Sequence, residues 1–256
     1  MSSLDGRVAL VTGVSRPLGI GAAVARRLHG LGATVFATGF TPHDAEMPWG
    51  VQPIGELGFD VHHHDLEDPV TPAALIDEVI DRHGRLDIVA AVHARSSHVG
   101  LEAVTVDELD RCWAANVRSI VLLAQRFAVV HRPASSGERP TGRMLWFTSG
   151  QHLGPMDDEI AYAVSKGALH QMTASIAHAL STSRIIANCI NPGPVDTGWA
   201  VGDRSDALDQ VAAMFPDGQW GTPESVADLV GFLVSDEGAW IRGQVLNSEG
   251  GFDRFG

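Results

Sequence analysis

Short apolar runs alternate along the chain with longer stretches in which apolar residues recur every three or four positions. The run RVALVT at positions 7–12 is rich in β-branched residues and stops at a glycine, as expected of a strand buried on both faces. The stretch 20–31 places Val24 and Leu28 on one helical face. The same patterns predict strands at 34–38, 59–64, 86–92, 143–148, 184–190 and 244–247, and helices at 69–83, 105–130 (with one irregularity), 160–180 and 223–233.

This alternation of strand and helix predicts one α/β domain over residues 1–256. Its core would be a doubly wound parallel sheet of about seven strands with helices on both faces. Two stretches fit neither pattern. Positions 132–142 are rich in Pro, Gly and Ser and predict an exposed loop. Positions 196–221 form an irregular insertion, which we expect to cover a ligand cleft.

Composition narrows the class of protein. Hydrophobic residues make up 45% of the chain, enough for a sizeable core, and the formal net charge of −13 disfavours nucleic acid or an anionic membrane as a partner. Cys112 and Cys189 have no metal or disulfide spacing, so we expect small core residues in a reducing compartment. The N-terminus lacks a signal-peptide layout, and no run of about 18 apolar residues occurs. We therefore expect a cytoplasmic protein.

The first predicted strand runs into the glycine loop TGVSRPLGIG, which holds Gly13, Gly19 and Gly21. Glycines between a first strand and a first helix let the backbone approach a pyrophosphate, and the helix N-terminus supplies N–H donors. The spacing G-x5-G-x-G differs from the G-x-G-x-x-G fingerprint. The alternative is a tight turn without a ligand.

The end of the second predicted strand bears on the choice of nicotinamide cofactor. A carboxylate there would bind the adenosine ribose hydroxyls and repel a 2′-phosphate. The chain has Thr38, Gly39 and Phe40 instead, and Arg16 lies in the glycine loop, within reach of a 2′-phosphate. This combination favours NADP over NAD. The alternative for Arg16 is a solvated side chain.

Tyr162 and Lys166 lie four residues apart on a predicted helix, so their side chains share one face. A neighbouring ammonium favours the phenolate, so we expect the pKa of Tyr162 to fall toward neutrality. Such a group can protonate a carbonyl oxygen or deprotonate an alcohol. The alternative is a pair of surface neighbours without a catalytic role.

Ser149 and Asn116 complete the candidate constellation. Ser149 ends the fifth predicted strand, at the edge where parallel sheets bind ligands, while strand alternation turns Thr148 to the opposite face. The alternative for Ser149 is a cap on the following turn. Asn116 interrupts a helix, where a freed backbone carbonyl could hold a water next to Lys166. The alternative is a polar residue that satisfies the irregularity.

These motifs, in this order, resemble the short-chain dehydrogenase/reductases over almost the whole chain. Further matches are Asp65–Leu66, NPGPVDT at 191–197 and SEGGF at 248–252. The resemblance implies a Rossmann-type fold and an oxidoreductase that transfers hydride between NADP(H) and a carbonyl or secondary alcohol. It assigns Tyr162 as acid or base, Lys166 as the group that lowers its pKa and holds the nicotinamide ribose, Ser149 as the group that orients the substrate oxygen, and Asn116 as the holder of a proton-relay water. Together with the residue-based arguments, it places cofactor contacts at Gly13, Ser15, Arg16, Gly19, Ile20, Gly21, Phe40, Asp65, Leu66, Ala91, Tyr162, Lys166, Pro192, Gly193, Val195 and Thr197.

Two departures from the family pattern stand out. The glycine loop is two residues longer, with Pro17 and Leu18 as the additions, and this form resembles a bacterial subset similar to 3-oxoacyl-acyl-carrier-protein reductases. That subset also shares MPWG at 47–50. The fourth strand reads AVHA at 91–94 where the family usually reads NNAG. This raises the alternative of a catalytically silent cofactor-binding regulator or scaffold. A further alternative is an NAD-dependent alcohol dehydrogenase.

The remaining features fix fewer properties. His62, His63 and His64 are consecutive in a predicted strand and cannot converge on one ion, so no metal is expected. Within the family that this chain resembles, enoyl reductases usually space the tyrosine and lysine further apart, so the resemblance implies carbonyl or alcohol chemistry for a spacing of four. The substrate is expected to be a small carbonyl or alcohol, including acyl thioesters, and the apolar residues Trp199, Met214, Phe215 and Trp220 would line its pocket or pack the insertion. The resemblance implies a homodimer or homotetramer.

Overall fold

The computed structural model describes residues 3–55, 57–132, 141–198 and 205–255. Seven strands form a single parallel sheet in the order β3-β2-β1-β4-β5-β6-β7. The strands are β1 (Val8–Thr12), β2 (Thr34–Gly39), β3 (Val61–His63), β4 (Ile88–Ala91), β5 (Gly142–Phe147), β6 (Ile185–Asn191) and β7 (Val245–Asn247). The predicted doubly wound α/β fold is therefore confirmed, and each strand bound lies within two residues of its prediction.

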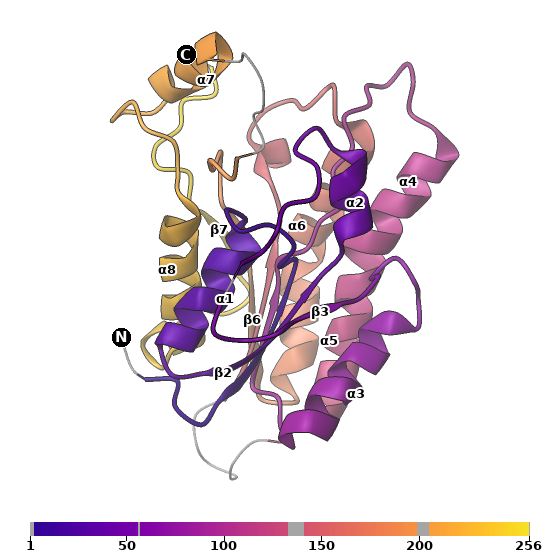
Figure 1. Cartoon of the computed structure of the whole chain (residues 1–256), viewed down its shortest axis with the longest axis vertical. Coiled ribbons are helices and arrows are strands. Elements are labelled where there is room, and N and C mark those ends of the chain that lie inside the picture. Colours follow the sequence, from indigo (N-terminus) through magenta and orange to yellow (C-terminus); the bar gives the residue numbers. More distant parts are fainter. Residues whose placement is uncertain (1–2, 56, 133–140, 199–204, 256) are drawn as a thin grey trace.

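The helices cover both faces of the sheet, as Figure 1 shows. α1 packs against α8 on one side, and α3 packs against α5 on the other, with α6 beside β6. The helices are α1 (Ile20–Gly30), α2 (Thr41–Glu46), α3 (Thr71–His83), α4 (Val106–Trp113), α5 (Ser119–Val130), α6 (Ile160–Ser181), α7 (Ser205–Ala213) and α8 (Pro223–Val234). Of these, α2 has no counterpart in the sequence prediction.

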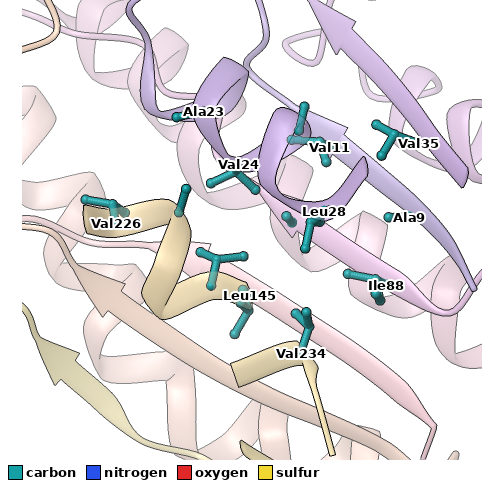
Figure 2. Packing of buried hydrophobic residues seen from close by; sticks show 14 of the residues in the cluster. Ala9, Val11, Ala23, Val24, Leu28, Val35, Ile88, Leu145, Val226 and Val234 are labelled. Carbon is teal, nitrogen blue, oxygen red and sulfur yellow. The ribbon is translucent and has the colours of Figure 1, made fainter. Parts of the chain in front are cut away.

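Alternation along the strands builds two separate cores. Ala9 and Val11 of β1 face α1 and α8, whereas Val8 and Leu10 face the α3–α5–α6 side. Figure 2 shows the first core, where Val24 and Leu28 of α1 meet strand and α8 side chains. Because the central strands are apolar on both faces, the sheet is fixed between its helical layers.

The predicted irregularity between positions 105 and 130 is real. α4 ends at Trp113, the chain makes a π-helical turn over Ala114–Arg118, and α5 begins at Ser119. We refer to residues 114–118 as the π turn. Such turns inside α-helices occur frequently at functional sites.

Two of the segments predicted from the sequence are described only in part by the structure. Most of the expected loop at 132–142 lies outside the described residues, as does Trp199. The insertion at 196–221 contains α7 and returns to the body of the fold where Val195 pairs with Gly221. Both cysteines are buried and unpaired, as expected of core residues. Within the described ranges, no helix combines the length and the apolar character needed to cross a membrane.

Candidate active site

A cleft of about 530 Å³ lies at the carboxyl edge of the sheet, where β1 and β4 are neighbours and the strand order reverses. This switch point is where open α/β sheets bind ligands. Most of the predicted site residues line it. These are Gly13, Ser15, Arg16, Gly19, Ile20, Gly21, Phe40, Asp65, Leu66, Ser149, Tyr162, Lys166, Pro192, Gly193, Val195 and Thr197.

Two predicted residues do not line the cleft. Ala91 ends β4 and is fully buried behind the cleft wall, which Val92, His93 and Ala94 form instead, so the contact of Ala91 with a cofactor remains a prediction. The chain leaves the sheet only after Ala91, which explains the shift. Asn116 is also fully buried.

The glycine loop (residues 13–21) joins β1 to α1 in a tight path. Gly13 has a φ of +76°, a conformation that side chains disfavour. A Cβ on Gly21 would lie 2.3 Å from the carbonyl oxygen of Gly13, so only glycine fits there. The N-cap of α1 is Gly19, which has no side chain to accept from the first-turn N–H groups. These unfilled donors at the cleft suit a pyrophosphate, and the cleft volume lies in the range of cofactor sites.

Arg16 is held rather than solvated. Its Nη1 donates to the carbonyl oxygen of Thr197 and its Nη2 to the Thr197 hydroxyl, both at 3.2 Å. Its guanidinium lies 4.5 Å from the centre of the Trp49 ring, and its Nε is 3.8 Å from Oδ1 of Asp44. Burial lowers the pKa of Arg16, and Asp44 opposes that shift. Arg16 thus joins the glycine loop to the segment that follows β6.

Asp44 is a site residue that the sequence reasoning missed. It belongs to α2, which begins just after β2, and its carboxylate is buried in the cleft wall. Oδ1 accepts from Nε1 of Trp49 at 2.9 Å, while Oδ2 has no hydrogen-bond partner among the described residues. The absence of an acid at 38–40 therefore does not leave this corner without one. The signal was the D-x-x-x-x-W spacing that ends in MPWG.

Tyr162, Ser149 and Lys166 meet at the other end of the cleft. The hydroxyls of Tyr162 and Ser149 lie close enough to interact, and both side chains line the cleft. Lys166 Nζ lies 5.4 Å from the centre of the Tyr162 ring and donates to the carbonyl oxygen of Phe147 at 2.8 Å. Thr148 points away as expected, and its hydroxyl donates to the Lys166 carbonyl at 2.8 Å.

The expected fall in the pKa of Tyr162 is wrong for this structure. Burial raises that pKa well above its usual value, and the charge of Glu159 raises it further. Burial also lowers the pKa of Lys166 to about 8. Removal from water disfavours both charged forms, and the Lys166 ammonium is directed at a main-chain carbonyl rather than at the phenol.

Asn116 lies in the π turn and fastens two elements together. Its Oδ1 accepts from the N–H of Arg95 at 2.7 Å, and its Nδ2 donates to Arg95 O at 3.0 Å and to Ser165 Oγ at 2.9 Å. The amide thus ties the segment after β4 to α6 close to the catalytic candidates. The relay water remains a prediction.

His93 is a second residue that the sequence reasoning missed, although it sits in the unusual AVHA strand end. Its Nδ1 is 2.6 Å from the Thr12 hydroxyl, and its Nε2 is 3.0 Å from Ala115 O and 2.9 Å from Ser119 Oγ. Burial, and then the charge of Lys166, lower the pKa of His93 to about 3. The imidazole is therefore neutral at any ordinary pH.

Three charged residues in or beside the cleft were also absent from the predicted site. Arg254, near the C-terminus, lines the cleft and pairs with Glu249, which also accepts from Asn191. Glu159 pairs with His98 at 3.0 Å. Glu249 lies within the SEGGF match and Glu159 lies three residues before Tyr162, but neither pattern shows which side chain pairs with these carboxylates.

The predicted cofactor contact Asp65 and the three consecutive histidines occupy distinct places. Asp65 Oδ1 accepts from the N–H of Glu67 at 2.8 Å and so shapes the turn after β3. His62 stacks on Phe36 with ring centres 4.2 Å apart, whereas His64 Nε2 lies 3.0 Å from Oε2 of Glu78. In the part of the chain that the structure describes, no three or more His, Cys, Asp or Glu side chains gather as a metal site would require.

Comparisons with known proteins agree with this geometry. A family model described as enoyl-(acyl carrier protein) reductase matches residues 13–253. An uncharacterized oxidoreductase, YjdA of Bacillus subtilis, is 36% identical over 99% of this chain and 100% of its own. The rhamnolipids biosynthesis 3-oxoacyl-[acyl-carrier-protein] reductase of Pseudomonas aeruginosa is 32% identical over 98% of this chain and 97% of its own.

Solved structures give the same result. A short chain dehydrogenase from Burkholderia cenocepacia, solved in complex with NADP, has a TM-score of 0.80 and 32% identity, and the match covers 98% of this chain and 99% of that one. The family model and the relatives each cover nearly the whole chain. This chain belongs to the short-chain dehydrogenase/reductase family and is an oxidoreductase.

Proposed function

We propose that the protein transfers hydride between NADP(H) and the carbonyl or secondary alcohol carbon of a small molecule. The observation that carries this proposal is the Ser149–Tyr162 hydroxyl pair, set beside buried Lys166 in a cleft that continues to the glycine loop. When bound, the nicotinamide cofactor supplies or accepts the hydride. The first-turn N–H groups of α1 and the glycine loop would hold the pyrophosphate of this cofactor. Its adenosine half would contact Ser15, Phe40, Asp65 and Leu66. Its nicotinamide half would contact Pro192, Gly193, Val195 and Thr197.

Tyr162 is suited to act as the general acid. Its raised pKa keeps the phenol protonated, so it holds the proton that a reduced carbonyl oxygen needs. Ser149 donates a second hydrogen bond to the same oxygen and fixes its position. Because Lys166 has a pKa of about 8, its ammonium is mostly charged at neutral pH and stabilises the phenolate that forms. Asn116 would hold the water that returns a proton to this pair.

Carbonyl chemistry is favoured over enoyl reduction, despite the description of the family model. Tyr162 and Lys166 are one helical turn apart on α6, and the Ser149 side chain lines the same cleft close to Tyr162. This arrangement presents two hydroxyls to one oxygen. The similarity to a 3-oxoacyl reductase supports 3-oxoacyl thioesters as a first substrate class. The insertion at 196–221 would cover the substrate, and Phe215 packs there against Phe252 with ring centres 4.9 Å apart.

Replacing the candidate acid tests the reaction. Tyr162→Phe keeps the ring and removes the proton, so turnover with NADPH should fall at least about a hundredfold. NADPH affinity, measured by fluorescence titration, should stay near that of the wild type. The panel of substrates comprises ketones, aldehydes and 3-oxoacyl thioesters. Turnover near wild type in the variant would remove Tyr162 from the acid role, and a wild-type protein that binds cofactor but reduces nothing would favour the silent scaffold.

NADP is favoured because Arg16 lies in the glycine loop and a similar dehydrogenase was solved with NADP. NAD is the second candidate, since the buried carboxylate of Asp44 faces Arg16 and its Oδ2 has no partner among the described residues to compete with a ribose hydroxyl.

Paired titrations with NADPH and NADH decide between the cofactors. We expect NADPH to bind at least about tenfold more tightly, because a charge-assisted contact to a phosphate is worth that much. Arg16→Ala should erase this preference and leave NADH affinity largely unchanged. Thr197→Val, which removes a partner of Arg16 but no charge, is the matched control. Tighter NADH binding by the wild type would assign the ribose hydroxyls to Asp44.

We propose further that the protein assembles as a homodimer or homotetramer through α4, α5 and α6. These three helices carry several large apolar side chains that are exposed to solvent. Val106, Leu109 and Trp113 lie on one face of α4 and are 75%, 37% and 49% exposed. Covering that face with a second copy would remove apolar surface from water.

A further inference from the structure

We propose that His93 is a positioning residue, which holds the cofactor-binding glycine loop and the Asn116-bearing π turn at a fixed distance through the two nitrogens of one neutral ring. This inference rests on the proposed function for its turnover arm only. His93 follows β4 at the switch point and lines the cleft wall, so it stands between the two halves of the candidate site.

The hydrogen-bond partners define which nitrogen carries the proton. Ala115 O can only accept, so Nε2, at 3.0 Å, must be the N–H donor. The Ser119 hydroxyl donates to the same carbonyl, and its oxygen lies 2.9 Å from Nε2. Nδ1 is then an acceptor, and the Thr12 hydroxyl donates to it at 2.6 Å. All partners of the ring are satisfied by this single tautomer, and none of them calls for a charged imidazole.

One side of the ring acts on the glycine loop. Thr12 ends β1 and precedes Gly13, and a Cβ on Gly13 would lie 2.6 Å from the His93 backbone nitrogen. The carbonyl of Gly13 in turn approaches Gly21 in the first turn of α1. The contact of Nδ1 with Thr12 therefore fixes the strand end from which the loop and the α1 N-terminus start.

The other side of the ring acts on the π turn. Ala115 lies within it and Ser119 begins α5, so Nε2 holds both sides of Asn116. Asn116 in turn is bonded to Ser165, which neighbours Lys166 on α6. A neutral ring is the suitable bridge here, because burial, and then the charge of Lys166, disfavour a protonated imidazole.

Two amide substitutions separate the two sides of the ring. The Asn side chain places its polar atoms near the position of Nδ1, and Gln places its own near Nε2. His93→Asn can still accept from Thr12 but cannot reach Ala115, whereas His93→Gln can still donate to Ala115 but leaves Thr12 without its partner. Thr12→Val removes the Nδ1 contact and Ser119→Ala removes one of the two Nε2 contacts, and both variants leave His93 in place.

The expected result is a crossed pattern. His93→Gln and Thr12→Val should weaken NADPH binding about tenfold, as for a lost hydrogen bond and its positioning effect, with little change in kcat. His93→Asn and Ser119→Ala should keep the NADPH affinity but lower kcat and speed amide hydrogen exchange in residues 114–119. A merely structural role would lower stability in all four variants without this division.

Equal changes of affinity and kcat in both His93 variants, or no change in either, would overturn the inference. If the His93 variants do not fold, the Thr12 and Ser119 variants decide it by the same two readouts. The affinity and exchange measurements need no substrate. If Tyr162→Phe did not reduce turnover, the proposed reaction would be contradicted, but the test of His93 would be unaffected.

Discussion

The only tyrosine and the only lysine of the chain, Tyr162 and Lys166, both lie in the cleft. Each can be observed alone by a probe specific for its residue type. The sequence predicted that they share a helix face, and the structure confirms it. The predicted direction of the pKa shift of Tyr162 was wrong. Sequence spacing does not show whether a side chain is buried, and burial is the largest cause of the shift.

The burial of Lys166 and Tyr162 predicts shifted pKa values that titrations can measure. In protein labelled with 13C at the lysine ε carbon, Lys166 gives one NMR signal. The pH midpoint of its titration should lie at about 8 rather than at the ordinary pKa of 10.5. The sign follows from desolvation, since burial favours the uncharged amine and the proton leaves at lower pH. An ultraviolet titration of the same protein should show no tyrosinate signal near the ordinary value of 10.0. A lysine midpoint at or above 10.5 would mean that the ammonium is solvated or paired with a carboxylate.

Other residues of the site were predictable to different degrees. The glycines and Ser149 stand beside predicted strand ends, so their place at the carboxyl edge followed from the fold. Asp44 was missed because the short helix that carries it was not predicted, and His93 was missed because its partners are far away in sequence. His93 bonds Thr12 across 81 positions, a separation that periodicity cannot detect.

At the scale of elements, periodicity located the strands and long helices but not the short α2. The strands are apolar on both faces and bounded by glycine or polar residues, which is a strong signal. α2 has six residues, too few for a helical period to show. The π turn was predictable as an irregularity because Asn116 interrupts an apolar helix, but its contacts to Arg95 and Ser165 were not.

Two glycines in one helix give a matched test of how α1 is seated. Gly21→Ala should lower the free energy of unfolding by about 3 kcal/mol, as at other overpacked sites. The reason is that its Cβ would lie 2.3 Å from the Gly13 carbonyl oxygen. Gly30→Ala, where a Cβ meets nothing within 4 Å, should stabilise it by about 0.5–1 kcal/mol. The measurement is urea unfolding with and without NADPH. Equal effects at the two positions would show that the loop yields to α1 and does not hold it.

At the scale of the whole molecule, the exposed face of α4 predicts self-association. Sedimentation equilibrium should give a dimer or tetramer, and Trp113→Glu should shift it toward the monomer, since a charge replaces a side chain that the partner would cover. Trp240→Glu is the matched control, because Trp240 is 92% exposed and lies before β7, away from α4. A monomeric wild type, or dissociation by Trp240→Glu alone, would contradict the proposed interface.

The strand order also governs how the chain can fold as it is synthesised. β1 pairs with β2 on one side and with β4 on the other, so its second edge stays open until residue 91 has been made. During that interval the nascent chain presents an apolar strand with unpaired backbone groups, which is a template for aggregation. The arrival of β4 closes this edge and, in the same step, sets the two strand ends side by side at the floor of the cleft. The ligand site therefore begins to form at the moment when the open edge of β1 is covered.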